Sequence, residues 1–110
     1  MCYNQSMNEK YPELTDFIEK SRQKIIELQT LLSSIPAMAP ESGGDGELKK
    51  CLSLKAYLIQ NGFKEEQFSQ YDAPDSRVSS KIRPNLILTV PGKSSKTVWV
   101  MSHLDVVFLL

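Results

Sequence analysis

The chain has 110 residues, of which 41% are hydrophobic and 24% are charged. Its thirteen basic and thirteen acidic residues cancel, so the net charge gives no reason to expect binding to nucleic acid or to an anionic membrane. No stretch approaches the roughly 18 apolar residues that a membrane span needs. We therefore expect one small globular domain, with neither nucleic acid nor membrane as a partner.

The amino-terminal end and the cysteines indicate the compartment. The first ten residues, MCYNQSMNEK, have no apolar core and do not resemble a secretory signal. We expect residues 1–10 to form a disordered tail. The two cysteines, Cys2 and Cys51, form no Cys-x-x-Cys pair. We expect a cytoplasmic protein with reduced thiols, in which Cys51 is a small core residue rather than a nucleophile.

Apolar side chains at steps of three, four and seven predict an amphipathic helix from Leu14 to Ile35. A capping box of Asp16 and Glu19 could begin it, and a start nearer Glu13 fits as well. Pro36 disfavours helical geometry at the residue before it and ends the helix. The apolar stripe favours a helix that packs on a core.

A turn-rich loop and a second helix follow. The loop, Ala37 to Gly46, reads AMAPESGGDG and lacks the spacing and the lysine of a Walker phosphate loop. The next apolar stripe predicts a helix from Glu47 to Gln60. Asn61-Gly62 supplies a left-handed stop, after which Phe63 can fold back onto the last turn.

The remaining chain predicts strands. Gln67 to Tyr71 is a marginal strand, and the polar segment Asp72 to Arg83 is a loop. Asn85–Val90 and Thr97–Val107 are nearly continuous apolar runs, typical of strands covered on both faces. The six residues between them are too few for a helical crossover. We therefore expect an α/β fold, with two helices on a mixed sheet that contains an antiparallel Asn85–Val90/Thr97–Asp105 hairpin.

The last predicted strand carries the one histidine of the chain, His103, followed two residues later by Asp105. Residues two apart on a strand face the same way, about 6.6 Å from each other. A neutral imidazole can bind zinc, and a neighbouring carboxylate can orient it. Without further information, one such pair is more often an ordinary surface pair than a metal site.

The segment Ser102–Val107 (SHLDVV) resembles the first metal-binding motif of the zinc-dependent dipeptidase, aminoacylase and deacylase family. That family includes succinyl-diaminopimelate desuccinylase, acetylornithine deacetylase and glutamate carboxypeptidases. Other stretches resemble the family in the same order, from about Tyr11 to Val107. They are Leu28–Pro36 (LQTLLSSIP), Glu41–Leu48 (ESGGDGEL), Asn61-Gly62-Phe63 and Arg83–Gly92 (RPNLILTVPG).

The resemblance implies that residues 11–110 are the incomplete amino-terminal portion of a metallopeptidase catalytic domain. In such a domain His103 would bind one of two zinc ions, with cobalt or manganese as alternatives. Asp105 would orient His103 and assist catalysis. The family's bridging aspartate, general-base glutamate, further acidic ligand and distal histidine have no counterparts in this sequence. We therefore expect the isolated chain to be inactive, although its parent would cleave a peptide or N-acyl amide bond.

The family usually continues its motif with proline and a Gly-Asp turn, whereas this sequence has Phe108-Leu109-Leu110. We interpret the chain as an interrupted amino-terminal fragment. One alternative is half of a split enzyme, complemented by a separate carboxy-terminal piece. Another is a non-catalytic interaction module. Because Val106–Leu110 is wholly apolar, we also expect self-association through an exposed strand edge.

Overall fold

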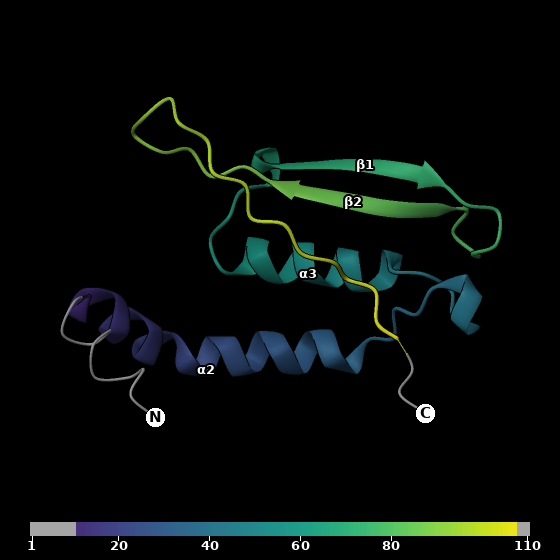
Figure 1. Cartoon of the computed structure of the whole chain (residues 1–110), viewed down its shortest axis with the longest axis horizontal. Helices are drawn as coiled ribbons and strands as arrows, with labels where there is room; N and C mark the ends of the chain where they lie inside the picture. Colours follow the sequence, from purple (N-terminus) through teal and green to yellow (C-terminus); the bar gives the residue numbers. More distant parts are fainter. Residues whose placement is uncertain (1–10, 108–110) are drawn as a thin grey trace. The chain divides into compact units, whose positions relative to one another are not determined.

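The computed structural model describes residues 11–107. The predicted disordered tail, Cys2 and the apolar residues Phe108–Leu110 lie outside them. Figure 1 shows the elements in chain order: α2 (Pro12–Ser34), η1 (Pro40–Ser42), α3 (Leu48–Gln60), η2 (Glu65–Gln67), β1 (Phe68–Pro74) and β2 (Ile82–Leu88). The described chain is thus a mixed α/β structure, and it divides into two compact units after Leu31.

Helix α2 occupies the span predicted for the first helix and begins two residues before Leu14. This start corresponds to the alternative near Glu13, because the carboxylate of Asp16 instead pairs with Lys20, 2.6 Å away. None of the residues of α2 is buried. The interpretation of its apolar stripe as a core face therefore stays a prediction.

The predicted second helix is confirmed as α3. Its end follows the expected stop, because Gly62 takes a left-handed φ of 105°. The Phe63 backbone N–H then donates to the Leu58 carbonyl at 3.2 Å, so the chain folds back over the last turn. As in any helix, these bonds join residues close in sequence, which is why the residue pattern predicts them.

Strands β1 and β2 form an antiparallel hairpin in which Phe68 faces Leu88 and Pro74 faces Ile82. The marginal strand at Gln67–Tyr71 is therefore confirmed and extended, whereas the expected loop Asp72–Arg83 shortens to residues 75–81. Val78 anchors this turn, since it is only 1% exposed. The Asp75 N–H also donates to the Lys81 carbonyl at 2.9 Å, which closes the turn.

The expected antiparallel pair Asn85–Val90/Thr97–Asp105 is wrong, because β2 pairs with β1 instead. Residues 97–105 form no strand in the structure, and Val98 to Met101 are 69 to 91% exposed. The prediction rested on the six residues between the two apolar runs, which are too few for a helical crossover. Once Pro74 pairs with Ile82, the competing turn is almost as short, and loop closure no longer favours the later segment.

The core of the described residues is small and consists of Ile35, Ala37, Cys51 and Val78. Helix α3 contacts β2, whose side chains are mostly half-buried, whereas β1 is largely exposed. The prediction of a strand covered on both faces is wrong for residues 97–107, which form no strand and are mostly exposed. Cys51, at 0% exposure, is a core residue as expected.

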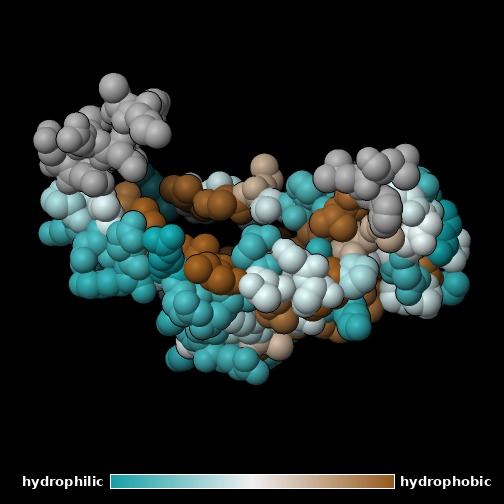
Figure 2. Space-filling model, turned by 90° about the horizontal axis from the view of Figure 1, so that it is seen from below, coloured by the Kyte–Doolittle hydropathy of each residue, from teal (hydrophilic) through white to brown (hydrophobic). Residues whose placement is uncertain are grey.

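Exposed apolar side chains are numerous in the part of the chain that the structure describes. The space-filling view shows hydrophobic side chains at the surface among hydrophilic ones (Figure 2). They include Phe17 of α2 and the segment Val98–Met101. Between residues 11 and 107, no helix combines the length and the apolar character that crossing a membrane requires.

Candidate functional site

The two residues predicted to carry the chemistry, His103 and Asp105, lie next to each other. The Nδ1 atom of His103 is 3.0 Å from Oδ1 of Asp105 and 2.9 Å from the carbonyl oxygen of the same residue. The predicted adjacency is confirmed, although the strand expected to create it is absent. Residues two apart in an extended segment are close whether or not a neighbouring strand pairs with them.

These contacts determine which nitrogen of the His103 ring carries hydrogen. A carbonyl oxygen and an ionised carboxylate only accept hydrogen bonds, so the Nδ1 atom between them must donate. In the neutral imidazole the lone pair then resides on Nε2, at the other edge of the ring. The His103 side chain is 81% exposed, which leaves Nε2 accessible to a ligand.

This arrangement suits one metal ligand but does not make a complete metal site. A histidine that binds zinc commonly donates its other ring N–H to a carboxylate, as His103 does to Asp105. A zinc site needs about three or four protein ligands. Within residues 11–107, no group of three or more His, Cys, Asp and Glu side chains could hold a metal ion.

The His103–Asp105 segment is attached to the rest of the fold through the next residue. The Val106 N–H donates to the carbonyl of Ala37 at 3.0 Å, and Val106 forms a parallel bridge with Met38. Ala37 is 0% exposed. The buried end of the loop after α2 thus provides the fixed point from which His103 and Asp105 project.

The glycine-rich loop holds the other side of this attachment. The N–H of Gly46 donates to the Met38 carbonyl at 3.0 Å, and that of Gly44 donates to the Ala39 carbonyl at 3.1 Å. A Cβ atom built on Gly44 would lie 2.1 Å from the Met38 oxygen. Only glycine therefore fits at this close backbone approach.

Asp45 ties the same loop to the turn of the hairpin. The Ser79 N–H donates to Oδ1 of Asp45 at 2.6 Å, and the Ser79 hydroxyl donates to Oδ2. Beside it, Arg77 pairs with Glu41 and also donates to Asp75 at 2.8 Å. The Asp45–Ser79 and Glu41–Arg77 contacts join segments more than 30 residues apart in sequence.

A second arginine connects the hairpin to the start of α3. Arg83, near the start of β2, pairs through two nitrogens with the carboxylate of Glu47, the residue before α3. The Nε–Oε2 distance is 2.6 Å. Arg83 also approaches Asp75, at 3.4 Å. The Glu47 side chain is only 7% exposed, so this pair lies in the most protected part of the network.

Hydrogen bonds to the ionised carboxylates lower the pKa values of three acidic residues in this network. The Ser79 side chain and then its backbone lower the pKa of Asp45. The Arg77 side chain is the main cause that holds the pKa of Asp75 well below its ordinary value. A backbone hydrogen bond and then Arg77 lower the pKa of Glu41. All three carboxylates are therefore held ionised at neutral pH.

Cys51 behaves differently, because its burial raises the pKa of the thiol. A thiol with a raised pKa is a poor nucleophile and a poor metal ligand at neutral pH. This agrees with the prediction that Cys51 is a core residue.

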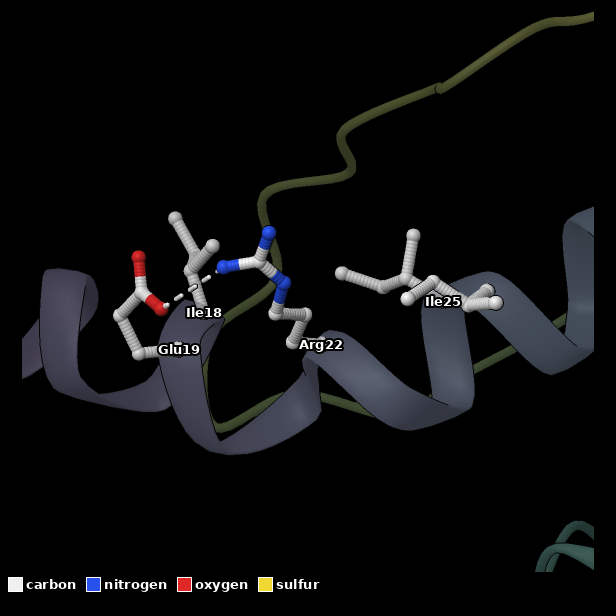
Figure 3. A pocket seen from close by; sticks show the side chains of 5 residues that line it. Ile18, Glu19, Arg22 and Ile25 are labelled. Atoms are coloured by element: carbon white, nitrogen blue, oxygen red, sulfur yellow. Dashed lines mark ion pairs between the residues drawn. The ribbon is translucent and has the colours of Figure 1, made fainter.

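A shallow hollow of about 230 Å³ is lined by Ile18, Glu19, Arg22, Ile25 and Ile26 of α2. Figure 3 shows that its labelled side chains all stand on this one helix, with Glu19 and Arg22 paired at 3.9 Å. It is a gap between neighbouring side chains rather than an enclosed site.

A further hollow, of about 440 Å³, lies at the amino-terminal end of α3. It is lined by Met38, Gly44, Asp45, Leu48 and Ser79 among others. It therefore adjoins the residues that join the glycine-rich loop to the hairpin. His103 and Asp105 do not line it.

Sequence reasoning missed the network around Asp45, Glu47 and the two arginines. It treated residues 37–46 as a turn-rich loop, residues 72–83 as a polar loop and Glu47 as the start of a helix. The one available signal was the acidic content of ESGGDGEL and the two arginines at positions 77 and 83. Opposite charges show that acidic and basic residues can pair, but they do not show which residues pair with each other.

No known protein-family profile matches the chain, and no curated protein or solved structure is significantly similar to it. The chemistry of the site must therefore be argued from its own residues.

Proposed function

We propose that the chain carries the first metal-binding motif of a two-metal, zinc-dependent amidohydrolase. In this proposal the protein acts in the cytoplasm on a peptide or N-acyl amide bond beside a free carboxylate. His103 provides one ligand, and the remaining ligands come from outside residues 11–107. The resemblance of Ser102–Val107 to the family motif suggests this reaction.

The observation that supports the proposal is the hydrogen bonding of His103. Because Nδ1 donates to two acceptors on Asp105, the ring presents the Nε2 lone pair outward. Asp105 fixes the tautomer and the orientation of the ring. A bound zinc ion would supply Lewis acidity for the substrate carbonyl.

A metal titration of the 110-residue chain tests this proposal. The imidazole resonances of His103 are followed by NMR while zinc is added. We expect the Nε2 resonance to move with zinc and the effect to vanish in His103→Ala. Asp105→Asn should weaken binding by about tenfold or more, because the orienting carboxylate is lost.

Asp72→Asn is the matched control. Asp72 lies on the exposed strand β1, where its carboxylate accepts a hydrogen bond from Gln70 at 2.8 Å. This variant should bind zinc as the unmodified chain does. Zinc binding that persists unchanged in His103→Ala would refute the assignment of His103.

A further inference from the structure

The segment that carries His103 has no strand partner of its own among the described residues, so something else must hold it in place. Its connection to the fold is the hydrogen bond from Val106 to the carbonyl of Ala37. That carbonyl belongs to a short stretch, Ala37–Ala39, that makes backbone contacts on two sides. Val106 lies on one side and the glycine-rich loop on the other.

We propose that the loop Gly44–Gly46 is the positioning element of the His103–Asp105 pair, acting through Ala37–Ala39 and Val106. The expected effect on zinc binding rests on the proposed function, since it concerns the same two residues. Its structural part, the connection from Gly44 to Val106, can be tested without any metal.

The loop can do this because its own position is fixed. Gly44 and Gly46 donate to the carbonyls of Ala39 and Met38, and Asp45 between them accepts two hydrogen bonds from Ser79. The hairpin turn that carries Ser79 is itself anchored by the buried Val78. A continuous series of short contacts thus runs from the hairpin turn to the segment next to Asp105.

Gly44 is the most sensitive point in this series. A methyl group there would meet the Met38 oxygen at 2.1 Å, far inside van der Waals contact, so one of the two backbones must move. Because the stretch Ala37–Ala39 also binds Val106, we expect such a movement to release the segment that carries His103 and Asp105. The His103 and Asp105 side chains should then exchange among several conformations. The preference of the His103 ring for the Nδ1–H tautomer should weaken as a result.

The test compares Gly44→Ala with Gly92→Ala, a glycine at which an added Cβ meets nothing within 4 Å. The readouts, without metal, are the hydrogen exchange of the Val106 amide and the imidazole tautomer of His103, both by NMR. We expect Val106 protection to fall by about tenfold or more in Gly44→Ala, with α3 amides unchanged. In Gly92→Ala both readouts should equal those of the unmodified chain.

Gly44→Ala could unfold the whole chain, which would show as lost protection throughout α3. In that case Asp45→Asn tests the positioning role of the loop, because it keeps the side-chain size and weakens the hydrogen bonds from Ser79. Selective loss of Val106 protection in that variant supports the proposal. Retained Val106 protection in a folded variant overturns it, and so does an unprotected Val106 amide in the unmodified chain.

A zinc titration of the same variants separates the two proposals. If His103 binds zinc in the unmodified chain, Gly44→Ala should weaken that binding whereas Gly92→Ala should not. Equal zinc binding in both variants would overturn the positioning role. If His103 binds no zinc at all, the proposed function fails, and the Val106 exchange still decides whether the loop holds this segment.

Discussion

Replacing Arg83 by methionine removes the charged partner of Glu47 and keeps most of the aliphatic stem. The Glu47 side chain is 7% exposed and would be left without the guanidinium that pairs with it. Breaking a buried ion pair in this way typically costs about 3 to 5 kcal/mol. Because Arg83 is itself 25% exposed, water offsets part of the loss. We expect a decrease in unfolding free energy of about 2 to 3 kcal/mol.

A loss of that size is a large fraction of the total stability of a small domain, about 5 to 15 kcal/mol. For a chain of this length it should lower the melting temperature by roughly 10 to 20 °C. Urea unfolding followed by the helical circular dichroism signal measures the free energy directly. Arg83→Met combined with Glu47→Gln should recover about 1 kcal/mol, since the unpaired charge is then gone as well.

Arg22→Met is the matched control for this experiment. Its partner Glu19 lies 3.9 Å away, and the side chains of Arg22 and Glu19 are 76% and 68% exposed. An exposed pair of this kind contributes at most about 1 kcal/mol. If Arg83→Met proved no more destabilising than Arg22→Met, the buried ion pair would not hold β2 to the start of α3 as argued.

Acid should weaken the contacts between the glycine-rich loop and the hairpin turn. Asp45, Asp75 and Glu41 have lowered pKa values in the folded chain, so the unfolded chain binds protons more readily. These carboxylates stabilise the folded chain above the ordinary carboxyl pKa of about 4, and this stabilisation is lost as pH falls below it. A melting temperature that rises as the pH is lowered from 5 to 3 would contradict this. Cys51 should react with thiol reagents only after unfolding, as mass mapping of the modified residue would show, and rapid labelling of the folded chain would contradict its burial. The exposed segment Val98–Met101 should promote self-association, so Val100→Lys should shift size-exclusion elution towards the monomer, and an unmodified chain that stays monomeric at high concentration would refute this. The isolated chain should hydrolyse no dipeptide or N-acyl amino acid with added zinc or cobalt, and turnover that is lost in His103→Ala would disprove the expectation.

Both helices were predictable because their stabilising bonds are local. In α3, the apolar spacing, the Asn61-Gly62 stop and the return of Phe63 all involve residues within one or two turns. The contact between His103 and Asp105 was predictable for a similar reason. Residues two apart are close in any extended backbone, so the adjacency survives even though the predicted strand is wrong.

The choice of strand partner was not predictable from the pattern. Backbone N–H and C=O groups are the same in every strand, so an apolar run indicates a strand without indicating its neighbour. Here the turn at residues 75–81 decides the partner, because Val78 is buried and Asp75 bonds to Lys81. Strand β1 looked marginal in sequence and yet forms the hairpin with β2.

The sequence by itself thus determined the spans of α2 and α3, the burial of Cys51 and the neighbouring positions of His103 and Asp105. The tertiary structure decided that Asp45 meets Ser79 and that Glu47 meets Arg83, across 34 and 36 residues. It also decided that Val106 rests on Ala37. Such contacts depend on how distant segments come together during folding, and charge or apolarity at one position does not specify the residue that will face it.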